Sequence, residues 1–105
     1  MTTGIDEDIN SAKVAEKLFD YQKHCLLLDV REEDEYALGH IPGAVNIPLS
    51  CLHARMKELK KDKSVLAICL TGGRAKVAAK ILSEQGFSVK IMVGGMRSWK
   101  GVIER

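Results

Sequence analysis

Short apolar runs alternate along this chain with longer amphipathic stretches, and this alternation limits the folds open to it. Residues 25–30, 64–69 and 87–93 are nearly continuous apolar runs, a pattern typical of strands that are covered on both faces of a sheet. Stretches with helical spacing occupy residues 11–21, 50–60 and 74–85. Strands that alternate with helices predict an α/β fold, with a parallel sheet flanked by helices on both faces.

The length of the chain predicts one domain, spanning residues 1–105. The net charge of +2 and the aromatic content of 5% argue against a nucleic-acid partner, because such partners need a basic surface or stacking platforms. An odd number of cysteines, three in all, does not fit a disulfide framework. It is consistent with a reducing compartment.

The first residues, Met1 to Asp8, are polar and acidic, so we expect no secretory signal peptide here. No apolar run approaches the roughly 20 residues that a membrane-spanning helix needs. We therefore expect a cytoplasmic protein without a membrane partner.

Several element ends are predicted by local chemistry. Ser50 is a candidate cap for the helix over 50–60, and Gly86 is expected to end the helix over 74–85. A very short strand is expected near Ala44–Ile47, and a last helix containing Trp99 is expected after Gly94-Gly95. The helix over 11–21 would bury one face, made of Val14, Ala15, Leu18 and Phe19.

Cys69 ends the second apolar run and is followed at once by a turn that contains Gly72, Gly73 and Arg74. Ligands of parallel sheets bind beyond the carboxyl ends of the strands, and Asp29 ends another strand. Free N–H groups before a helix, together with the helix dipole and the arginine charge, favour a thiolate. The residues thus predict a nucleophilic cysteine in an anion-binding loop. The alternative is a cysteine that only fills space in the core.

Three motifs, in this order, resemble the rhodanese homology domain over nearly the whole chain. Asp29-Val30-Arg31 with the later Glu35 is similar to its "DVR…E" segment. Residues 39–48, GHIPGAVNIP, are similar to its "GHIPGA.NIP" signature, and residues 94–99, GGMRSW, resemble its "GG…W" closure. The cysteine loop lies between the second and third motifs, where that family has its active site.

The resemblance implies a five-stranded parallel sheet and a sulfurtransferase that carries sulfur as a persulfide on Cys69. The donor would be thiosulfate, a persulfide or a polysulfide, and the acceptor a thiol, a protein or cyanide, with ping-pong kinetics. Backbone N–H groups would hold the transferred sulfur. No metal or cofactor is implied. The substrate-binding residues would be Leu70, Thr71, Gly72, Gly73, Arg74 and Ala75.

Other matched residues have supporting or structural interpretations. Asp29 and Arg31 are expected to tie loops together at the sheet edge, His40 to be structural and Trp99 to pack in the core. The chain departs from better-known members at Leu70, where a polar or basic residue often stands, and at Ala75, where serine is common. We therefore predict that thiosulfate is a mediocre substrate.

Other functions stay open from the sequence. Related folds that act as cysteine phosphatases place five residues between cysteine and arginine, whereas four separate Cys69 from Arg74. The shorter loop suits a single sulfur atom better than phosphate. A non-enzymatic regulatory module or a sulfur-carrier partner is a further alternative, and a redox sensor is a variant of it. Cys25 is interpreted as a core residue, and Cys51 as a weak candidate for a resolving thiol.

Overall fold

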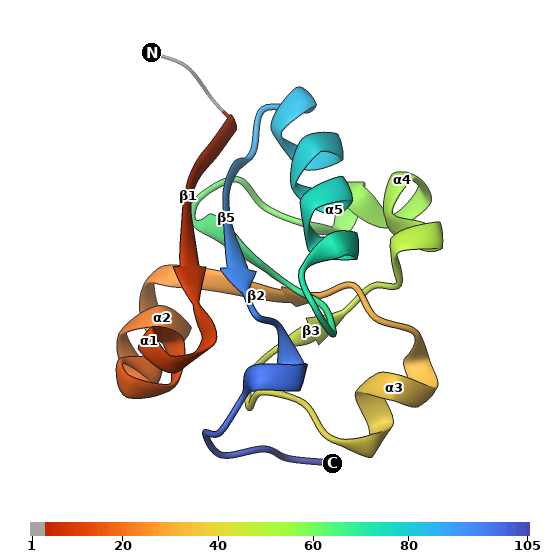
Figure 1. The fold of residues 1–105 in the computed structure, drawn as a ribbon. Coiled ribbons are helices and arrows are strands. Elements are labelled where there is room, and N and C mark those ends of the chain that lie inside the picture. The colour runs from red at the N-terminus through yellow and green to blue at the C-terminus, as the bar shows by residue number, and fades with distance from the viewer. Residues whose placement is uncertain (1–3) are drawn as a thin grey trace.

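The structure, a computed structural model, describes residues 4–105. Five parallel strands form one sheet in the order β1-β5-β4-β2-β3, as Figure 1 shows. This confirms the α/β fold and the parallel sheet. The strands are β1 (Gly4–Asn10), β2 (Cys25–Asp29), β3 (Val45–Asn46), β4 (Ser64–Ile68) and β5 (Ser88–Val93).

Helices cover both faces of this sheet (Figure 1). On one face Leu52 and Leu82 pack with the strands, and on the other Val14 does so. The α-helices are α1 (Ser11–Glu16), α2 (Leu18–His24), α3 (Glu33–Leu38), α4 (Leu52–Arg55) and α5 (Gly73–Glu84). The 3₁₀ turns are η1 (Leu49–Cys51), η2 (Met56–Glu58) and η3 (Met96–Ser98). Each helix described within residues 4–105 is too short or too polar to span a bilayer.

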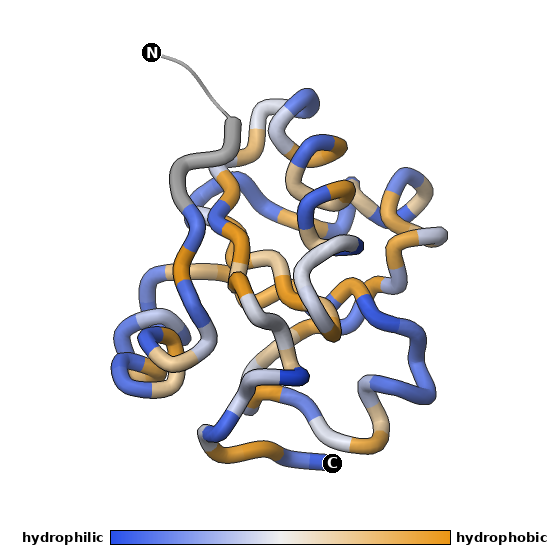
Figure 2. Tube along the Cα trace, in the orientation of Figure 1, coloured by the Kyte–Doolittle hydropathy of each residue, from blue (hydrophilic) through white to orange (hydrophobic). Residues whose placement is uncertain are grey.

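Strand β4 is buried on both faces, which explains its uninterrupted apolar sequence. Val65 and Ala67 belong to the core under α4 and α5, whereas Leu66 and Ile68 belong to the core under α1 and α2. All four side chains are completely buried. Apolar segments run through the middle of the molecule and polar ones over its periphery in Figure 2.

Strand β1 was not predicted from the residues, although the family resemblance implied a fifth strand. Its sequence, GIDEDIN, is polar and has no apolar run. β1 stands at the edge of the sheet and pairs in parallel with β5. An edge strand has only one neighbour, so it needs less apolar surface than a central strand.

The single helix predicted over 11–21 is wrong. The helix is interrupted at Lys17, whose backbone conformation is not helical and which separates α1 from α2. Val14 is completely buried as expected, but Phe19 is 75% exposed. The break turns the second helix, so that positions spaced for one continuous helix no longer share a face.

Two further helix predictions need correction. Residues 50–60 form the succession η1, α4 and η2 instead of one helix, and the Ser50 side chain caps none of the three. The last predicted helix is the single turn η3, with Trp99 just after it. Trp99 is partly buried against the core under α1 and α2, and its Nε1 donates a hydrogen bond to the Val102 carbonyl.

Candidate active site

Cys69 follows the last residue of β4 and precedes α5, so it lies at the carboxyl edge of the sheet. Asp29, the last residue of β2, pairs in register with Ile68 of β4. The two strand ends that the sequence analysis singled out are therefore neighbours. This is the edge at which parallel sheets bind their ligands.

Two backbone N–H groups point at the Cys69 sulfur. Sγ accepts hydrogen bonds from Gly72 N, at 2.9 Å, and from Ala75 N, at 3.3 Å. Gly72 has a φ of +115°, which a residue with a side chain rarely adopts, and this conformation starts α5. Residues 69–75 thus form a loop, called the cradle below, around a sulfur atom whose residue is only 1% exposed.

The other predicted substrate-binding residues belong to the cradle, but within residues 4–105 none of them has a hydrogen bond to Sγ of Cys69. Leu70 is 37% exposed and Thr71 also faces solvent. Gly73 is the first residue of α5 and is exposed. Arg74 follows it, half-buried. Their part in binding a substrate stays a prediction.

The Arg74 guanidinium is engaged by the carboxylate of Glu35 on α3. Nη1 donates to Oε1 at 2.6 Å and Nη2 donates to Oε2 at 2.9 Å. These hydrogen bonds lower the pKa of Glu35 from 4.5 to about 2, and they raise the pKa of Arg74. In the sequence Glu35 stands out only as part of a motif, because nothing local links it to Arg74, 39 residues later in the chain.

Asp29 and Arg31 form a buried ion pair beside the cradle. Nη2 of Arg31 lies 2.7 Å from Oδ2 of Asp29 and also donates to the Gly39 carbonyl at 2.9 Å. The Asn46 amide donates to the backbone oxygens of both Asp29 and Arg31. This network joins the ends of β2, α3 and β3 at one edge of the sheet.

His40 is held in a structural arrangement. Its ring stacks on Tyr36 with 3.7 Å between centroids, and its Nδ1 lies 2.9 Å from the Tyr36 carbonyl oxygen. On the other side of the ring, Nε2 of His40 lies 3.4 Å from Oε1 of Glu104. These contacts fix the loop between α3 and β3.

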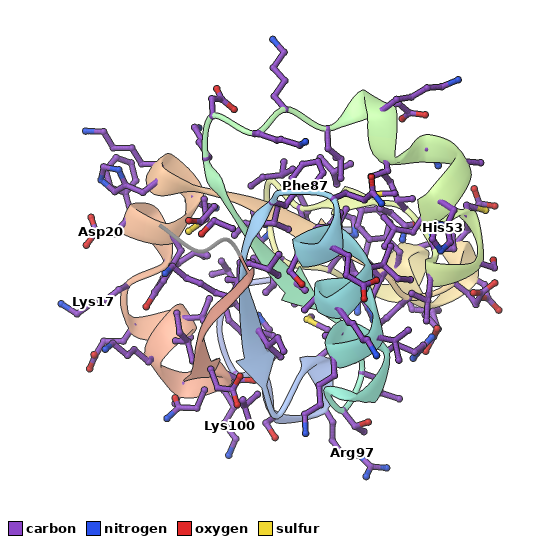
Figure 3. All side chains as sticks on the ribbon, turned by 90° about the horizontal axis from the view of Figure 1, so that it is seen from above. Lys17, Asp20, His53, Phe87, Arg97 and Lys100 are labelled. Atoms are coloured by element: carbon purple, nitrogen blue, oxygen red, sulfur yellow. The ribbon has the colours of Figure 1, made fainter. Side chains whose placement is uncertain are left out.

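The turn η3 holds the cradle from the side of β5. The backbone N–H groups of Met96 and Arg97 donate to the carbonyls of Cys69 and Leu70, at 2.8 and 2.9 Å. The Arg97 side chain is exposed and lies at the periphery of the molecule (Figure 3). The GGMRSW motif is visible in the sequence, but this backbone clamp is not; the Gly94-Gly95 pair is the signal that could have indicated it.

The remaining cysteines differ from Cys69 in their surroundings. Cys25 is buried, and burial raises its pKa. Cys51 is half-buried, and its sulfur lies 3.9 Å from the Ser50 hydroxyl oxygen. Within the described part of the chain, no group of three or more His, Cys, Asp or Glu residues is placed to bind a metal ion.

Comparisons with known proteins identify the family of this chain. The sequence model of the Rhodanese-like domain matches residues 11–101. "Putative sulfurtransferase YtwF" of Bacillus subtilis is 39% identical over 95 residues, which are 90% of this chain and 91% of that protein. "Putative sulfur carrier protein YrkF" of the same organism is 44% identical over 79 residues, 74% of this chain, and these span only 43% of its own length.

A solved structure shows the same fold. The crystal structure of a rhodanese-related protein from Thermoplasma volcanium superposes with a TM-score of 0.83 at 32% sequence identity. The match covers 94% of this chain and 98% of that protein.

Proposed function

Because this chain belongs to the Rhodanese-like domain family, we propose that it is a sulfurtransferase that carries sulfur as a persulfide on Cys69. The names of two relatives, "Putative sulfurtransferase YtwF" and "Putative sulfur carrier protein YrkF", support a role in sulfur transfer. The donor is thiosulfate, a persulfide or a polysulfide, and the acceptor is a thiol, on a small molecule or a protein, or cyanide. We place this activity in the cytoplasm and assign the domain to residues 1–105.

The reaction consists of two displacements. The Cys69 thiolate attacks the outer sulfur of the donor, a new S–S bond forms, and the donor's own bond to that sulfur breaks. The leaving group, sulfite or a thiolate, departs with the electron pair. An acceptor then attacks the outer sulfur of the persulfide and Cys69 leaves as a thiolate. Splitting the transfer in this way replaces one difficult encounter by two simpler ones.

One observation carries the proposal: the N–H groups of Gly72 and Ala75 both donate to Sγ of Cys69. A sulfur that receives two backbone hydrogen bonds at a helix N-terminus is stabilised as an anion. The persulfide is anionic as well, and N–H groups fixed before the reaction need no reorganisation during it. The loop therefore favours both the resting nucleophile and the loaded intermediate.

A phosphatase activity is not supported by the same site. The cradle closes on one sulfur atom, with two of its N–H groups already bonded to Sγ. A phosphate ester would need several donors directed at its own oxygens. We expect no turnover of an aryl phosphate that depends on Cys69.

Intact mass spectrometry tests the proposed function. The protein is exposed to thiosulfate, or separately to glutathione persulfide, and its mass is compared before and after. We expect a species heavier by one sulfur atom that disappears on addition of cyanide or dithiothreitol. Cys69→Ala should not form it, whereas Cys25→Ala and Cys51→Ala should.

The same experiment separates the three thiols. An adduct that survives in Cys69→Ala and disappears in Cys51→Ala would assign the chemistry to Cys51. No adduct from either donor in the unmodified sequence would contradict the sulfurtransferase proposal and favour a binding module.

A further inference from the structure

The positive charge of Arg74 in the cradle is balanced by a carboxylate on another element. Arg74 is the cation of the loop, and both of its terminal nitrogens donate to the carboxylate of Glu35 on α3. The two side chains are about one-third exposed, at 33% and 29%. A guanidinium in such a bidentate pair has its planar fork directed at the carboxylate.

We infer that Glu35 is a specificity-determining residue, which makes the site prefer sulfur donors with a single negative charge over the doubly charged thiosulfate ion. This inference rests on the proposed function and names the class of donor that it takes. The residue acts through Arg74, so Glu35 is a positioning residue that does not itself touch the reacting sulfur.

Thiosulfate brings two negative charges to a nucleophile that is itself anionic. When its outer sulfur reaches Cys69, the sulfonate end remains outside the cradle and needs a cation beside it. Arg74 offers a pair of zero net charge, and Leu70, next to the cysteine, adds none. The second negative charge of thiosulfate is therefore repelled by the Cys69 thiolate, and no unpaired cation of the loop offsets this repulsion.

A donor of the form R–SO₂–S⁻ lacks that second charge. Its transfer is balanced without any oxidant or reductant: the Cys69 thiolate bonds to the outer sulfur, the bond between that sulfur and the sulfonyl group breaks, and a sulfinate leaves with the electron pair. A persulfide gives the same product on Cys69, with a thiolate as the leaving group. Both donors present at most one charge at the reacting end.

The sharpest test compares two donors of the same shape. Methanethiosulfonate differs from thiosulfate by a methyl group in place of one anionic oxygen, so the ratio of their kcat/KM values reports the second charge. We expect the sequence as it stands to favour methanethiosulfonate. Glu35→Gln should shift the ratio toward thiosulfate by about fivefold, which corresponds to about 1 kcal/mol.

Three further variants isolate the contribution of the Glu35–Arg74 pair. Glu33→Gln removes the same charge from the same helix, and Glu33 has no hydrogen bond to Arg74, so the ratio should move much less. Arg74→Gln leaves Glu35 uncompensated and should shift the ratio away from thiosulfate. The double variant of Glu35→Gln and Arg74→Gln should return the ratio toward its starting value, since the two charges act on each other.

The Glu35→Gln side chain retains an oxygen for the Glu32 N–H group, which Glu35 now binds at 2.9 Å, so α3 should keep its cap. If Glu35→Gln does not fold, the change in the kcat/KM ratio of Arg74→Gln tests the inference by itself. A general loosening of the cradle would lower kcat/KM for both donors alike and leave the ratio constant.

An unchanged ratio in Glu35→Gln, or in Arg74→Gln, would overturn the inference while the Cys69 persulfide still forms. Loss of the persulfide itself in the unmodified sequence would instead remove the proposed function, and the inference with it.

Discussion

Gly95 has very little room for a side chain. Its φ is +58°, and a Cβ atom there would stand 2.3 Å from the Leu70 carbonyl oxygen and 2.6 Å from that of Cys69. These are the two carbonyls that η3 holds through the Met96 and Arg97 N–H groups. The close approach to the cradle of the turn between β5 and η3 therefore depends on a glycine at this position.

We expect Gly95→Ala to destabilise the fold by more than about 2 kcal/mol in urea unfolding, because both strain and backbone overlap oppose it. Gly73→Ala is the matched control, since a Cβ at Gly73 has nothing within 4 Å and the position is the first of α5. Its effect should stay within about 0.5 kcal/mol. Equal losses in both variants would contradict the role given to the close contact.

Leu70 is the other residue at which one change has a clear direction. It is 37% exposed and adjoins the nucleophile, so Leu70→Arg would add a cation that has no carboxylate partner in place. We expect kcat/KM for thiosulfate to rise by about fivefold. The assay uses thiosulfate as the donor and cyanide as the acceptor, and in it Leu70→Met should leave kcat/KM unchanged. A rise in both variants would point to side-chain shape rather than charge.

At the scale of elements, the ends of β2, α3 and β3 depend on one buried ion pair. Asp29 is completely buried and Arg31 is 5% exposed. Removing one partner of such a pair leaves an uncompensated charge in the interior, which is more costly than removing both. The pair therefore fixes the strand end next to which Cys69 lies.

Arg31→Met should lower the free energy of unfolding by about 3–5 kcal/mol, and Asp29→Asn added to it should recover part of that loss. Arg55→Met is the contrast, because Arg55 and Glu58 form an exposed pair on the surface, where solvent weakens the attraction. Its urea midpoint should stay close to that of the unmodified sequence. A larger loss in Arg55→Met than in Arg31→Met would reject this account.

The elements that the sequence predicted well are those whose surroundings are uniform. β2 and β4 are covered on both faces, so their composition alone marks them. β1 could not be predicted because this edge strand has no such apolar pattern. The helix break at Lys17 could not be predicted because no proline or glycine lies there.

The same distinction holds for the site. The cradle is contiguous in sequence, so its residues could be named from the loop Cys69–Ala75. Glu35 and the η3 clamp reach it from distant parts of the chain. Such contacts depend on the packing of whole elements, which local spacing does not specify.

For the molecule as a whole, the Glu35–Arg74 pair makes stability depend on pH in a defined window. The folded-state pKa of Glu35 is about 2, below its ordinary value of 4.5. A depressed pKa means that the contribution is complete above about pH 4.5 and is lost as the pH falls toward 2. The hydrogen bonds from Arg74 lower the pKa of Glu35, and they outweigh the burial of the carboxylate, which raises it.

We expect the stability difference between the unmodified sequence and Glu35→Gln to be constant above about pH 5 and to shrink steadily as the pH falls below about 4.5. Urea midpoints of both proteins, measured at pH 6, 4 and 3, would show it. Glu33→Gln serves as the control for the loss of an acidic side chain as such. A difference that grows toward low pH would have the wrong sign for this pair.

The strand order also determines when the backbone around Cys69 can be fully assembled during synthesis of the chain. β1 is made first but pairs only with β5, the last strand of the sheet to be made. The η3 clamp on Cys69 and Leu70 is made later still. A nascent chain that ends after α5 would hold the cysteine and its two amide donors without the backbone that fixes them from the other side. The reactive centre is thus complete only after β5 and η3 have been made.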